Sequence, residues 1–511
     1  MPAPYVVSIP KSIKSILKLR IPFVLWFSCT AIASILIAPA LLNAGINSDM
    51  VWQRFLGAQI LETHRIPTHL GTETLSAPGA PWVPQEWLLG LALALAQRAH
   101  TYVLLVAASI FAVIATMFLG AARTRRRVAA QPLFLALCVI LIGLSTLESF
   151  GVRAQVFAWP LFALLLLLLD DGSAVVWWCL PLTALWSNLH ASVVLAPVMA
   201  FLYAVGALID EHAWTPRAIR YFLLVPLLLL SACVNPFGWH LPFYAIALQH
   251  SPVRAFITEW QPTGIRDYTL WLSIVPICLG VALLYWRKRC AFASADVMVV
   301  LACAYLSLSA SRNIPIFSIA VAPIVCAGLA EAFPLGDSSR EHPIERALQG
   351  LVALVVLPAI CWFSFHHSTI SYLREGMLLP TDAINFIGES RGQKRLFCYD
   401  FAHCSLALGR PGFRTFMDGR CDPFPWPVWE RYRTVIQVRR GWERVLDDYR
   451  ITHVLTKDAA QLTRSIGASG HWKRIYHQNG YSVFAHAKFR NDSSRHVGLP
   501  PLTVGISLKN S

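Results

Sequence analysis

Charged side chains are scarce in this 511-residue sequence: Asp, Glu, Lys and Arg together make up 14% of it, whereas hydrophobic residues make up 56%. With a mean hydropathy of +0.53, the chain has more apolar surface than one soluble core buries. Four windows contain none of the four charged residue types, and each matches the roughly 20 residues with which a helix crosses hydrocarbon. These windows are 21–43, 101–122, 191–209 and 313–330.

Common catalytic and metal-binding signatures are also missing. The sequence contains no CxxC, HExxH or P-loop pattern, so neither a zinc site nor ATP hydrolysis is supported. Nine of the twelve cysteines lie in or beside apolar segments, where a thiol packs as a small apolar group. The other three are Cys398, Cys404 and Cys421, and two of them are able to pair in an oxidising compartment.

Lysine and arginine gather in three short stretches, and these set the expected orientation. The stretches are 11–20, 123–127 and 287–289. Basic residues in short loops resist translocation, so the N-terminus and both later loops are expected in the cytoplasm. Apolar windows then predict about eleven crossings, at 21–43, 101–122, 131–147, 154–169, 173–188, 191–209, 219–234, 269–286, 297–311, 313–331 and 349–366. An odd number of crossings puts the C-terminus outside.

The sequence thus predicts a polytopic α-helical protein of the plasma (inner) membrane with a C-terminal extracytoplasmic α/β domain. We expect a cytoplasmic N-terminus at 1–20, a transmembrane domain at 21–366 with external loops at 44–100 and 235–268, an external domain at 367–487 and a flexible tail at 488–511. The pattern in the external domain alternates short apolar runs with amphipathic helices. Strands are expected at 395–399, 413–417, 451–455, 472–476 and 481–485, and helices at 381–389, 428–438 and 442–449.

One apolar stretch, Trp87 to Ala96, is too short to match the other spans. Counting it as a crossing would move the 123–127 cluster to the outside, so we interpret it as a helix lying at the outer interface. A short true span, with a later helix failing to cross, is the alternative. The formal net charge of +15 is spread over loops and the external domain, which favours membrane phosphates rather than nucleic acid as partners.

Asp49 follows the first predicted helix, where bilayer meets water. A carboxylate there is able to accept a proton from a hydroxyl or to bind a cation, because apolar surroundings raise its basicity. An N-cap for the helix that follows explains the same residue equally well.

Further polar residues face the same side of the membrane. Glu148 and Arg153 occupy the turn between the third and fourth predicted spans, and boundary charges are costly enough to indicate a site. Arg312 offers a planar fork of donors to a phosphate, although it is also able to extend to lipid headgroups. His190 is either a ligand or a hydrogen-bonded interface histidine.

The second external loop holds Arg254 and Glu259 five positions apart, beside aromatic residues and between prolines. This spacing fits a loop posed to bind a substrate, and it fits a solvated, salt-bridged loop as well. In the external domain, the run 417–422 follows a predicted strand end, and we interpret it as a turn.

Several blocks together resemble the GT-C superfamily of membrane glycosyltransferases, and especially an uncharacterised bacterial branch of it. The similarity runs over nearly the whole chain, and the order and sidedness of its short motifs give it weight. The blocks are Asp49-Met50-Val51-Trp52, 57–61, the 77–88 run that holds Glu86, Asn188-Leu189-His190, 235–238, Glu259-Trp260-Gln261-Pro262, Arg312-Asn313-Ile314-Pro315 and Asp418-Gly419-Arg420.

The resemblance implies an enzyme that moves a sugar from a polyprenyl-phosphate carrier to an acceptor on the outer face. The matching catalytic positions are Asp49 and Glu148. The paired acidic motif usual at the second position is absent, so a divalent cation stays open and no metal ligand is assigned. The expected substrate contacts are Glu86, His190, Arg254, Glu259 and Arg312.

Two other classes of function compete with this interpretation. A non-enzymatic membrane scaffold or lipid-binding protein, whose outer domain binds a partner, fits the same composition. A transporter fits less well, because mid-membrane charges are too few to mark a coupled-ion route. The sequence gives no indication of the sugar, the acceptor or the oligomeric state.

Overall fold

The computed structural model describes residues 48–128, 132–147, 149–287, 292–334, 379–390 and 392–487. The chain divides into two compact units. The helical unit comprises residues up to Thr72, Ala77–Leu379 and Gly419–Trp429. The sheet unit comprises Glu73–Ser76, Pro380–Asp418 and the residues from Glu430. Each unit therefore contains one short segment that is flanked in sequence by residues of the other unit.

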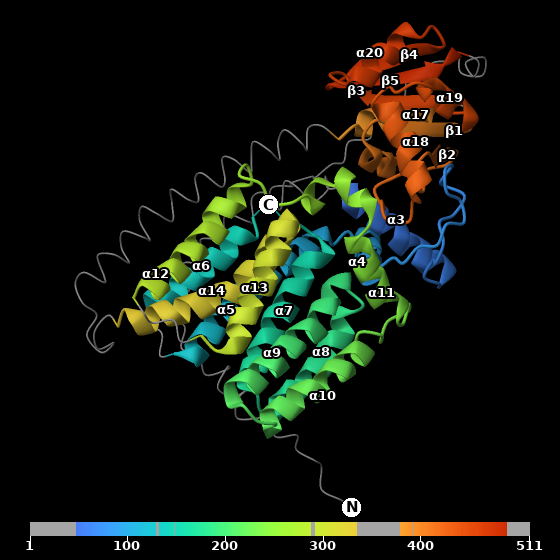
Figure 1. Cartoon of the computed structure of the whole chain (residues 1–511). Coiled ribbons are helices and arrows are strands. Elements are labelled where there is room, and N and C mark those ends of the chain that lie inside the picture. The colour runs from blue at the N-terminus through green and yellow to red at the C-terminus, as the bar shows by residue number, and fades with distance from the viewer. Residues whose placement is uncertain are drawn as a thin grey trace, which may run out of the picture. The chain divides into compact units, whose positions relative to one another are not determined.

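The helical unit is a bundle whose long helices lie side by side (Figure 1). Its α-helices are α3 (Ser48–Thr63), α4 (Trp87–Arg98), α5 (Tyr102–Arg127), α6 (Pro132–Ser145), α7 (Ala154–Asp171), α8 (Cys179–Trp186), α9 (Leu195–Glu211), α10 (Pro216–Ser231), α11 (His240–Gln249), α12 (Val275–Trp286), α13 (Ser294–Ser309) and α14 (Ile314–Ala332). Short helical turns join them: η1 (Ala174–Trp178), η2 (Ala191–Val194), η3 (Pro252–Phe256), η4 (Thr258–Trp260), η5 (Leu270–Ile274) and η6 (Ser311–Asn313).

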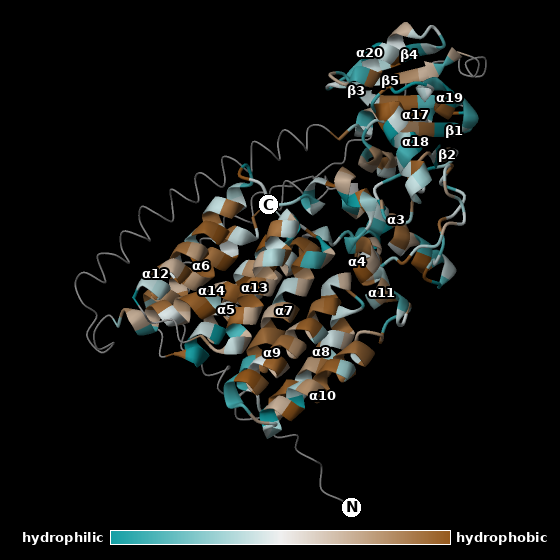
Figure 2. Cartoon of the chain, viewed as in Figure 1, coloured by the Kyte–Doolittle hydropathy of each residue, from teal (hydrophilic) through white to brown (hydrophobic). Residues whose placement is uncertain are grey.

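The helices of the bundle are apolar along most of their length, as Figure 2 shows. Four of the helical segments in the described part of the chain are long and apolar enough to cross a membrane: Leu104–Arg127, Ala154–Asp171, Ala191–Glu211 and Ser311–Ala332. The last of these is 89% buried within the protein, so α14 forms the centre of the bundle. The chain is thus a multi-pass membrane protein.

The predicted spans between 101 and 331 each coincide with a helix or with a turn and helix in series. Apolar runs predict these elements well because burial in lipid or in the bundle requires apolar side chains on every face. The predicted spans 21–43 and 349–366 lie outside the described residues, so a total of about eleven stays a prediction. The 87–96 stretch forms the 12-residue helix α4.

A pair of glycines lets α3 and α4 approach closely. A methyl group added to Gly57 would lie 1.9 Å from the carbonyl oxygen of Gly90 and 2.8 Å from Cβ of Ala94. No side chain fits there, because both distances are far below van der Waals contact. This contact places the Gln53 side chain of α3 beside the start of α4.

The sheet unit contains a five-stranded sheet in the order β2-β1-β3-β5-β4. Its strands are β1 (Lys394–Cys398), β2 (Phe413–Thr415), β3 (His453–Lys457), β4 (Trp472–Gln478) and β5 (Tyr481–His486). The three strands β2, β1 and β3 run parallel, and β5 and β4 add an antiparallel hairpin. Asn479 and Gly480 have positive φ at the hairpin tip, the geometry that an Asn-Gly turn favours.

Helices complete the sheet unit, three of them where the sequence predicts a helix and two, η8 and α20, where it does not. They are α17 (Thr381–Glu389), η8 (Phe401–Ala407), α18 (Trp426–Ile436), α19 (Trp442–Asp448) and α20 (Gln461–Ala468). The predicted strands and helices of this domain are confirmed within a few residues. Thr74 adds one parallel bridge to Thr415, so four residues from the first loop extend the sheet beyond β2.

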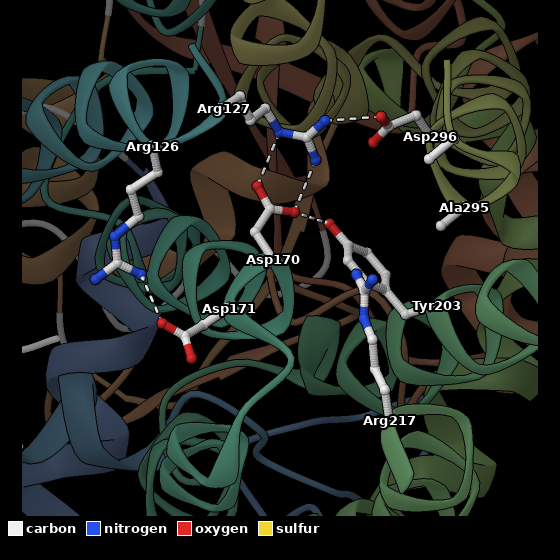
Figure 3. Close-up of a pocket in the computed structure, with 9 residues that line it drawn as sticks. Arg126, Arg127, Asp170, Asp171, Tyr203, Arg217, Ala295 and Asp296 are labelled. Carbon is white, nitrogen blue, oxygen red and sulfur yellow. Dashed lines mark hydrogen bonds and ion pairs between the residues drawn. The ribbon is translucent and has the colours of Figure 1, made fainter. Parts of the chain in front are cut away.

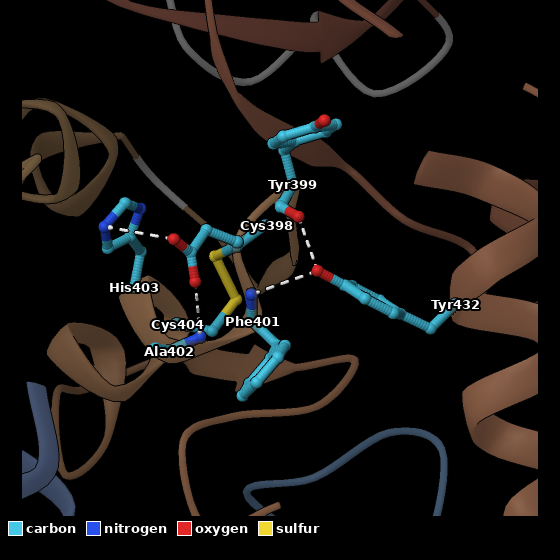
Figure 4. Close-up of a disulfide and its surroundings, with 8 residues drawn as sticks. Cys398, Tyr399, Phe401, Ala402, His403, Cys404 and Tyr432 are labelled. Atoms are coloured by element: carbon cyan, nitrogen blue, oxygen red, sulfur yellow. Dashed lines mark hydrogen bonds and ion pairs between the residues drawn. A yellow bond between two sulfur atoms is a disulfide. The ribbon is translucent and has the colours of Figure 1, made fainter. Parts of the chain in front are cut away.

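A disulfide closes the turn between β1 and η8 in the sheet unit. It joins Cys398 and Cys404, whose Cα atoms lie 5.8 Å apart (Figure 4). Beside it, the Tyr432 hydroxyl donates to the carbonyl oxygen of Tyr399 and accepts from the backbone N–H of Phe401. The prediction that two of these three cysteines are able to pair is therefore confirmed for Cys398 and Cys404.

Candidate active site

Arg153 lies at the centre of a polar cluster where several helices of the helical unit begin. It directly precedes α7, and one of its terminal nitrogens contacts Asp49 Oδ2 at 2.8 Å and Glu259 Oε1 at 2.5 Å. Asp49 comes from the first turn of α3 and Glu259 from η4. A single guanidinium thus joins two carboxylates that are more than 200 residues apart in sequence.

The contacts of Asp49, Glu259 and Arg254 show which groups these predicted site residues bind within the protein. Asp49 lies inside the first turn of α3, and its carboxylate pairs with Arg153. Glu259 also pairs with Arg153, whereas the Arg254 guanidinium donates to the backbone carbonyls of its own loop and of Ser309. Burial raises the pKa of Glu259, but the nearby arginines outweigh it, so this pKa lies below its usual value.

Glu86 is the second important carboxyl of the cluster, at the residue before α4. It accepts a hydrogen bond from Nε2 of Gln53 on α3. Burial and the negative charge of Asp49 raise the pKa of Glu86 from 4.5 to about 7, against opposing contributions that include Arg312. Glu86 therefore changes protonation near neutral pH, which an ordinary glutamate does not.

His190, which precedes η2, is held in one tautomer. Its Nδ1 accepts from the backbone N–H of Ser192 at 3.1 Å and lies 2.7 Å from the Ser192 hydroxyl, which itself accepts from the Trp186 indole. Nε2 therefore carries the hydrogen and faces Glu86 Oε1 at 3.8 Å. Burial and two nearby arginines lower the pKa of His190 to about 3, so the ring is neutral.

Arg312 lies beside His190, and none of the described carboxylates forms an ion pair with it. Its guanidinium contacts Gln155 Oε1 at 3.2 Å and stacks over the Trp260 ring at 5.4 Å. Nε2 of His190 is 3.4 Å away, but a nitrogen that carries a hydrogen cannot accept from Arg312. The carboxylates of Glu259, Glu86 and Asp49 nevertheless lie near enough to interact with the charge of Arg312.

The segment Gly419–Trp429 adds residues that the sequence interpretation left as a turn. The Tyr244 hydroxyl, from α11, donates to Asp422. Burial and repulsion from Glu86 raise the pKa of Asp422 to about 7, although Tyr244 opposes the shift. Arg420 is buried and stacks over the Trp82 ring at 5.1 Å. Asp422 is therefore a second carboxyl of the helical unit whose pKa burial raises, and the charge of Glu86 contributes to the shift.

The structure brings together five of the predicted site residues: Asp49, Glu86, His190, Glu259 and Arg312. Arg254 is not part of the ion-pair cluster, and Glu148 lies outside the described residues. Sequence reasoning placed Arg153 on the correct face but gave it no role, and it missed Asp422 and Tyr244. The signal for Arg153 was available, because an arginine at a helix boundary in a membrane protein needs anionic partners.

A divalent cation fits the described residues poorly. They contain no group of three or more His, Cys, Asp or Glu side chains arranged to hold a metal ion. The carboxylates of Asp49 and Glu259 already neutralise Arg153. The predicted second acidic residue, Glu148, lies outside the described residues, so a divalent cation stays an open prediction.

Comparison with known proteins gives a result at the level of structure alone. No protein family and no curated protein sequence matches the chain. The oligosaccharyltransferase AglB from Archaeoglobus fulgidus, solved in complex with an inhibitory peptide and a dolichol-phosphate, matches 91% of this chain and 74% of its own, with a TM-score of 0.58 and 10% identity. ArnT from Cupriavidus metallidurans, bound to undecaprenyl phosphate, matches 91% of this chain and 98% of its own, with a TM-score of 0.52 and 13% identity.

Both of these proteins are GT-C glycosyltransferases. The chain has the GT-C fold. The predicted resemblance is therefore confirmed for the fold, over nine-tenths of the chain. At these identities a shared fold does not transfer an activity, so the function of this chain must be argued from its own residues.

Proposed function

We propose that this chain is a membrane glycosyltransferase that moves a sugar from a polyprenyl-phosphate carrier to an acceptor on the outer face of the membrane. The observation that carries the proposal is that one cluster contains both Arg312 and Glu86: His190 lies beside each of them, and burial raises the pKa of the Glu86 carboxyl to about 7. Transfer from a lipid phosphate needs one group of each kind. Both structural neighbours were solved with a polyprenyl-type phosphate, which agrees with this donor class.

In the proposed reaction the acceptor oxygen or nitrogen forms a bond to the anomeric carbon, and the bond between that carbon and the phosphate oxygen breaks. The electron pair of the broken bond stays on the polyprenyl phosphate. Arg312 binds this phosphate through its planar donors and stabilises the charge that develops there. The proton of the acceptor passes to a carboxylate.

Glu86 is a better candidate for that carboxylate than Asp49. Its raised pKa makes it a stronger base once ionised, whereas the ion pair with Arg153 stabilises the Asp49 carboxylate as an anion. Asp49 keeps a place in the proposal as the residue that, with Glu259, positions Arg153 and raises the basicity of Glu86. Glu148 stays a predicted second acidic residue of the site.

The runner-up proposal is a non-enzymatic lipid-binding protein or scaffold. In that case Arg312 would bind a lipid phosphate without any transfer. What favours an enzyme is the carboxyl pKa of about 7 at Glu86, since binding of an anion gains nothing from a buried acid.

The test uses the purified full-length protein in lipid nanodiscs with radiolabelled undecaprenyl-phosphate hexose or pentose and an envelope extract as acceptor. We expect label to leave the polyprenyl phosphate, and Glu86→Gln to lower the rate by roughly 10²-fold or more, as loss of a general base does. Arg312→Ala should weaken binding of undecaprenyl phosphate by about tenfold or more.

Glu62→Gln is the matched control, because Glu62 lies exposed on the same helix as Asp49. If Asp49→Asn stops transfer while Glu86→Gln does not, the base is Asp49. Binding of undecaprenyl phosphate that needs Arg312, without transfer from any donor, would favour the lipid-binding protein.

A further inference from the structure

The arginines that line the polar cavity at the end of α7 all have a carboxylate within ion-pair distance (Figure 3). The pairs are Arg126 with Asp171, Arg127 with Asp170, and Arg217 with Glu211. A cation that is partly withdrawn from water is costly unless an anion faces it. An arginine cluster that lacks such partners is therefore a candidate to bind an anion from outside the chain.

Arg395 and Arg414 are direct neighbours in the sheet unit. β1 and β2 run parallel, and the Cα atoms of these two residues are partners in the register. Their side chains therefore leave the same face of the sheet, where like charges opposite each other repel. Burial, and then the charges of Arg414 and of Arg450 in the turn between α19 and β3, lower the pKa of Arg395. Three cations thus act on one another.

Tyr449 connects this pair to two further arginines. Its ring packs on Phe416 at 4.9 Å and lies 5.6 Å from the guanidinium of Arg431, which also donates to its hydroxyl. The backbone carbonyl of Tyr449 accepts from Nε of Arg395 at 2.8 Å. Arg450 is the next residue of the chain. Arg395, Arg431 and Arg450 are therefore gathered around one tyrosine.

No carboxylate among the described residues balances these three arginines. Arg395, Arg431 and Arg450 form no ion pair within the part of the chain that the structure describes. Two acidic residues end α19 just before Tyr449, and both are exposed. Asp447 faces His486 at 3.7 Å, and Asp448 pairs with no arginine of the cluster. The cluster therefore has a net positive charge that an external anion would offset.

We propose that Arg395 and Arg450, with Arg431 beside them, bind a phosphate monoester. Within the described residues, the terminal nitrogens of Arg395 and the exposed guanidinium of Arg450 donate no hydrogen bond, so both are available as donors. A phosphate monoester carries a charge of about −1.5 to −2 at neutral pH and balances two arginines, whereas a carboxylate balances one. The phosphate belongs to a soluble compound or to a lipid headgroup, and binding does not depend on sugar transfer.

The first test measures binding of glycerol phosphate to the full-length protein in phosphatidylcholine nanodiscs by isothermal titration calorimetry. We expect glycerol phosphate to bind about tenfold tighter than glycerate, its carboxylate analogue. Arg395→Gln and Arg450→Gln should each weaken this binding about tenfold. Arg474→Gln is the matched control, because Arg474 is exposed on β4, at the other edge of the sheet from β2.

The second test locates the anion and its source by arginine modification with phenylglyoxal, followed by mass spectrometry. We expect glycerol phosphate to slow the modification of Arg395 and Arg450 but not that of Arg474. Nanodiscs that contain phosphatidic acid present the same phosphate monoester on a lipid. Protection in these nanodiscs without glycerol phosphate would identify a lipid headgroup as a source, and protection by glycerol phosphate alone would identify a soluble phosphate.

Three outcomes would overturn the proposal. Equal binding of glycerol phosphate and glycerate would exclude selection of a phosphate, and unchanged binding in both arginine variants would exclude this cluster. Loss of binding in Arg312→Ala would assign the phosphate to the candidate active site instead. Thermal unfolding shows whether Arg395→Gln keeps its fold. Arg450→Gln stays informative in either case, because the described side chain of Arg450 makes no hydrogen bond or ion pair.

Discussion

Two carboxyl groups of the candidate site differ in environment and so in chemistry. Asp49 is one-third exposed and pairs with Arg153, whereas Glu86 is more buried and accepts from the neutral amide of Gln53. An ion pair stabilises the charged form of an acid, while burial beside another carboxylate favours the neutral form. Such a difference allows one residue to hold a charge and the other to exchange a proton.

The first prediction concerns the pH dependence of transfer. Glu86 accepts a proton only when ionised, and burial with the charge of Asp49 raises its pKa to about 7. Activity is therefore expected to be high above pH 7 and to fall as the pH drops through that value. The measurement is kcat/KM between pH 5 and 9 for wild type and for Asp49→Asn, which should lower the midpoint because it removes a negative charge. A wild-type midpoint near 4.5 would contradict the role of Glu86 as base.

Sequence reasoning found most of the residues of the site but not their partners. Asp49, Glu86 and Arg312 stand in short motifs beside apolar windows, so their membrane boundary position was predictable. That Arg153 joins Asp49 to Glu259 was not, because this pairing depends on how α3, α7 and η4 pack. Asp422 was missed for the same reason, since its partner Tyr244 is 178 residues away in sequence.

At the level of elements, the contact between α3 and α4 fixes the geometry around Glu86. Glu86 is the residue before α4 and Gln53 lies on α3, so their hydrogen bond requires the two helices to stay close. Gly57 permits that distance, because the carbonyl of Gly90 occupies the space where a side chain would begin. The short helix α4 therefore has a positioning role whether or not it crosses the bilayer.

Gly57→Ala tests this role. The added methyl group would force α3 and α4 apart, and we expect a loss of about 1–3 kcal/mol in stability, as overpacking of a tight contact causes. Thermal unfolding measures this loss. The midpoint of the pH profile that depends on Glu86 should also shift, because the hydrogen bond from Gln53 to Glu86 weakens. Gly264→Ala is the control, since the nearest atom to its added methyl would be 3.9 Å away. Unchanged unfolding in both variants would contradict the tight contact.

Elements were predictable where the signal is local. Long apolar runs specify the helices of the bundle, and alternation with turn residues specifies the hairpin of β4 and β5. β2 is shorter than predicted, at Phe413–Thr415. The bridge from Thr74 to Thr415 has no local signal at all, because it joins residues 341 positions apart by backbone hydrogen bonds alone.

At the scale of the whole molecule, the disulfide bears on orientation. Disulfides persist in oxidising compartments, so the Cys398–Cys404 bond agrees with the predicted extracytoplasmic position of the sheet unit. The basic clusters predict the same orientation by an independent argument. Orientation itself stays a prediction.

Thiol labelling of the protein in intact cells tests the orientation. We expect Cys398 and Cys404 to resist a membrane-impermeant maleimide until a reductant is added, and mass spectrometry of the 394–421 region measures the label. Labelling of Cys398 and Cys404 without reductant, only after the cells are opened, would place the domain in the cytoplasm.

Replacing both Cys398 and Cys404 by serine should destabilise the sheet unit by about 2 kcal/mol.

The way in which the chain alternates between its two units has a consequence for dissecting the protein. Because Gly419–Trp429 belongs to the helical unit, a chain cut after Leu379 loses Arg420 and Asp422 together with the sheet. A loss of activity after such a truncation would thus be ambiguous, since it removes a wall of the candidate active site. Point substitutions within Gly419–Trp429 test the contribution of the candidate active site, and substitutions before 419 or after 429 test that of the sheet unit. A deletion cannot separate the two contributions.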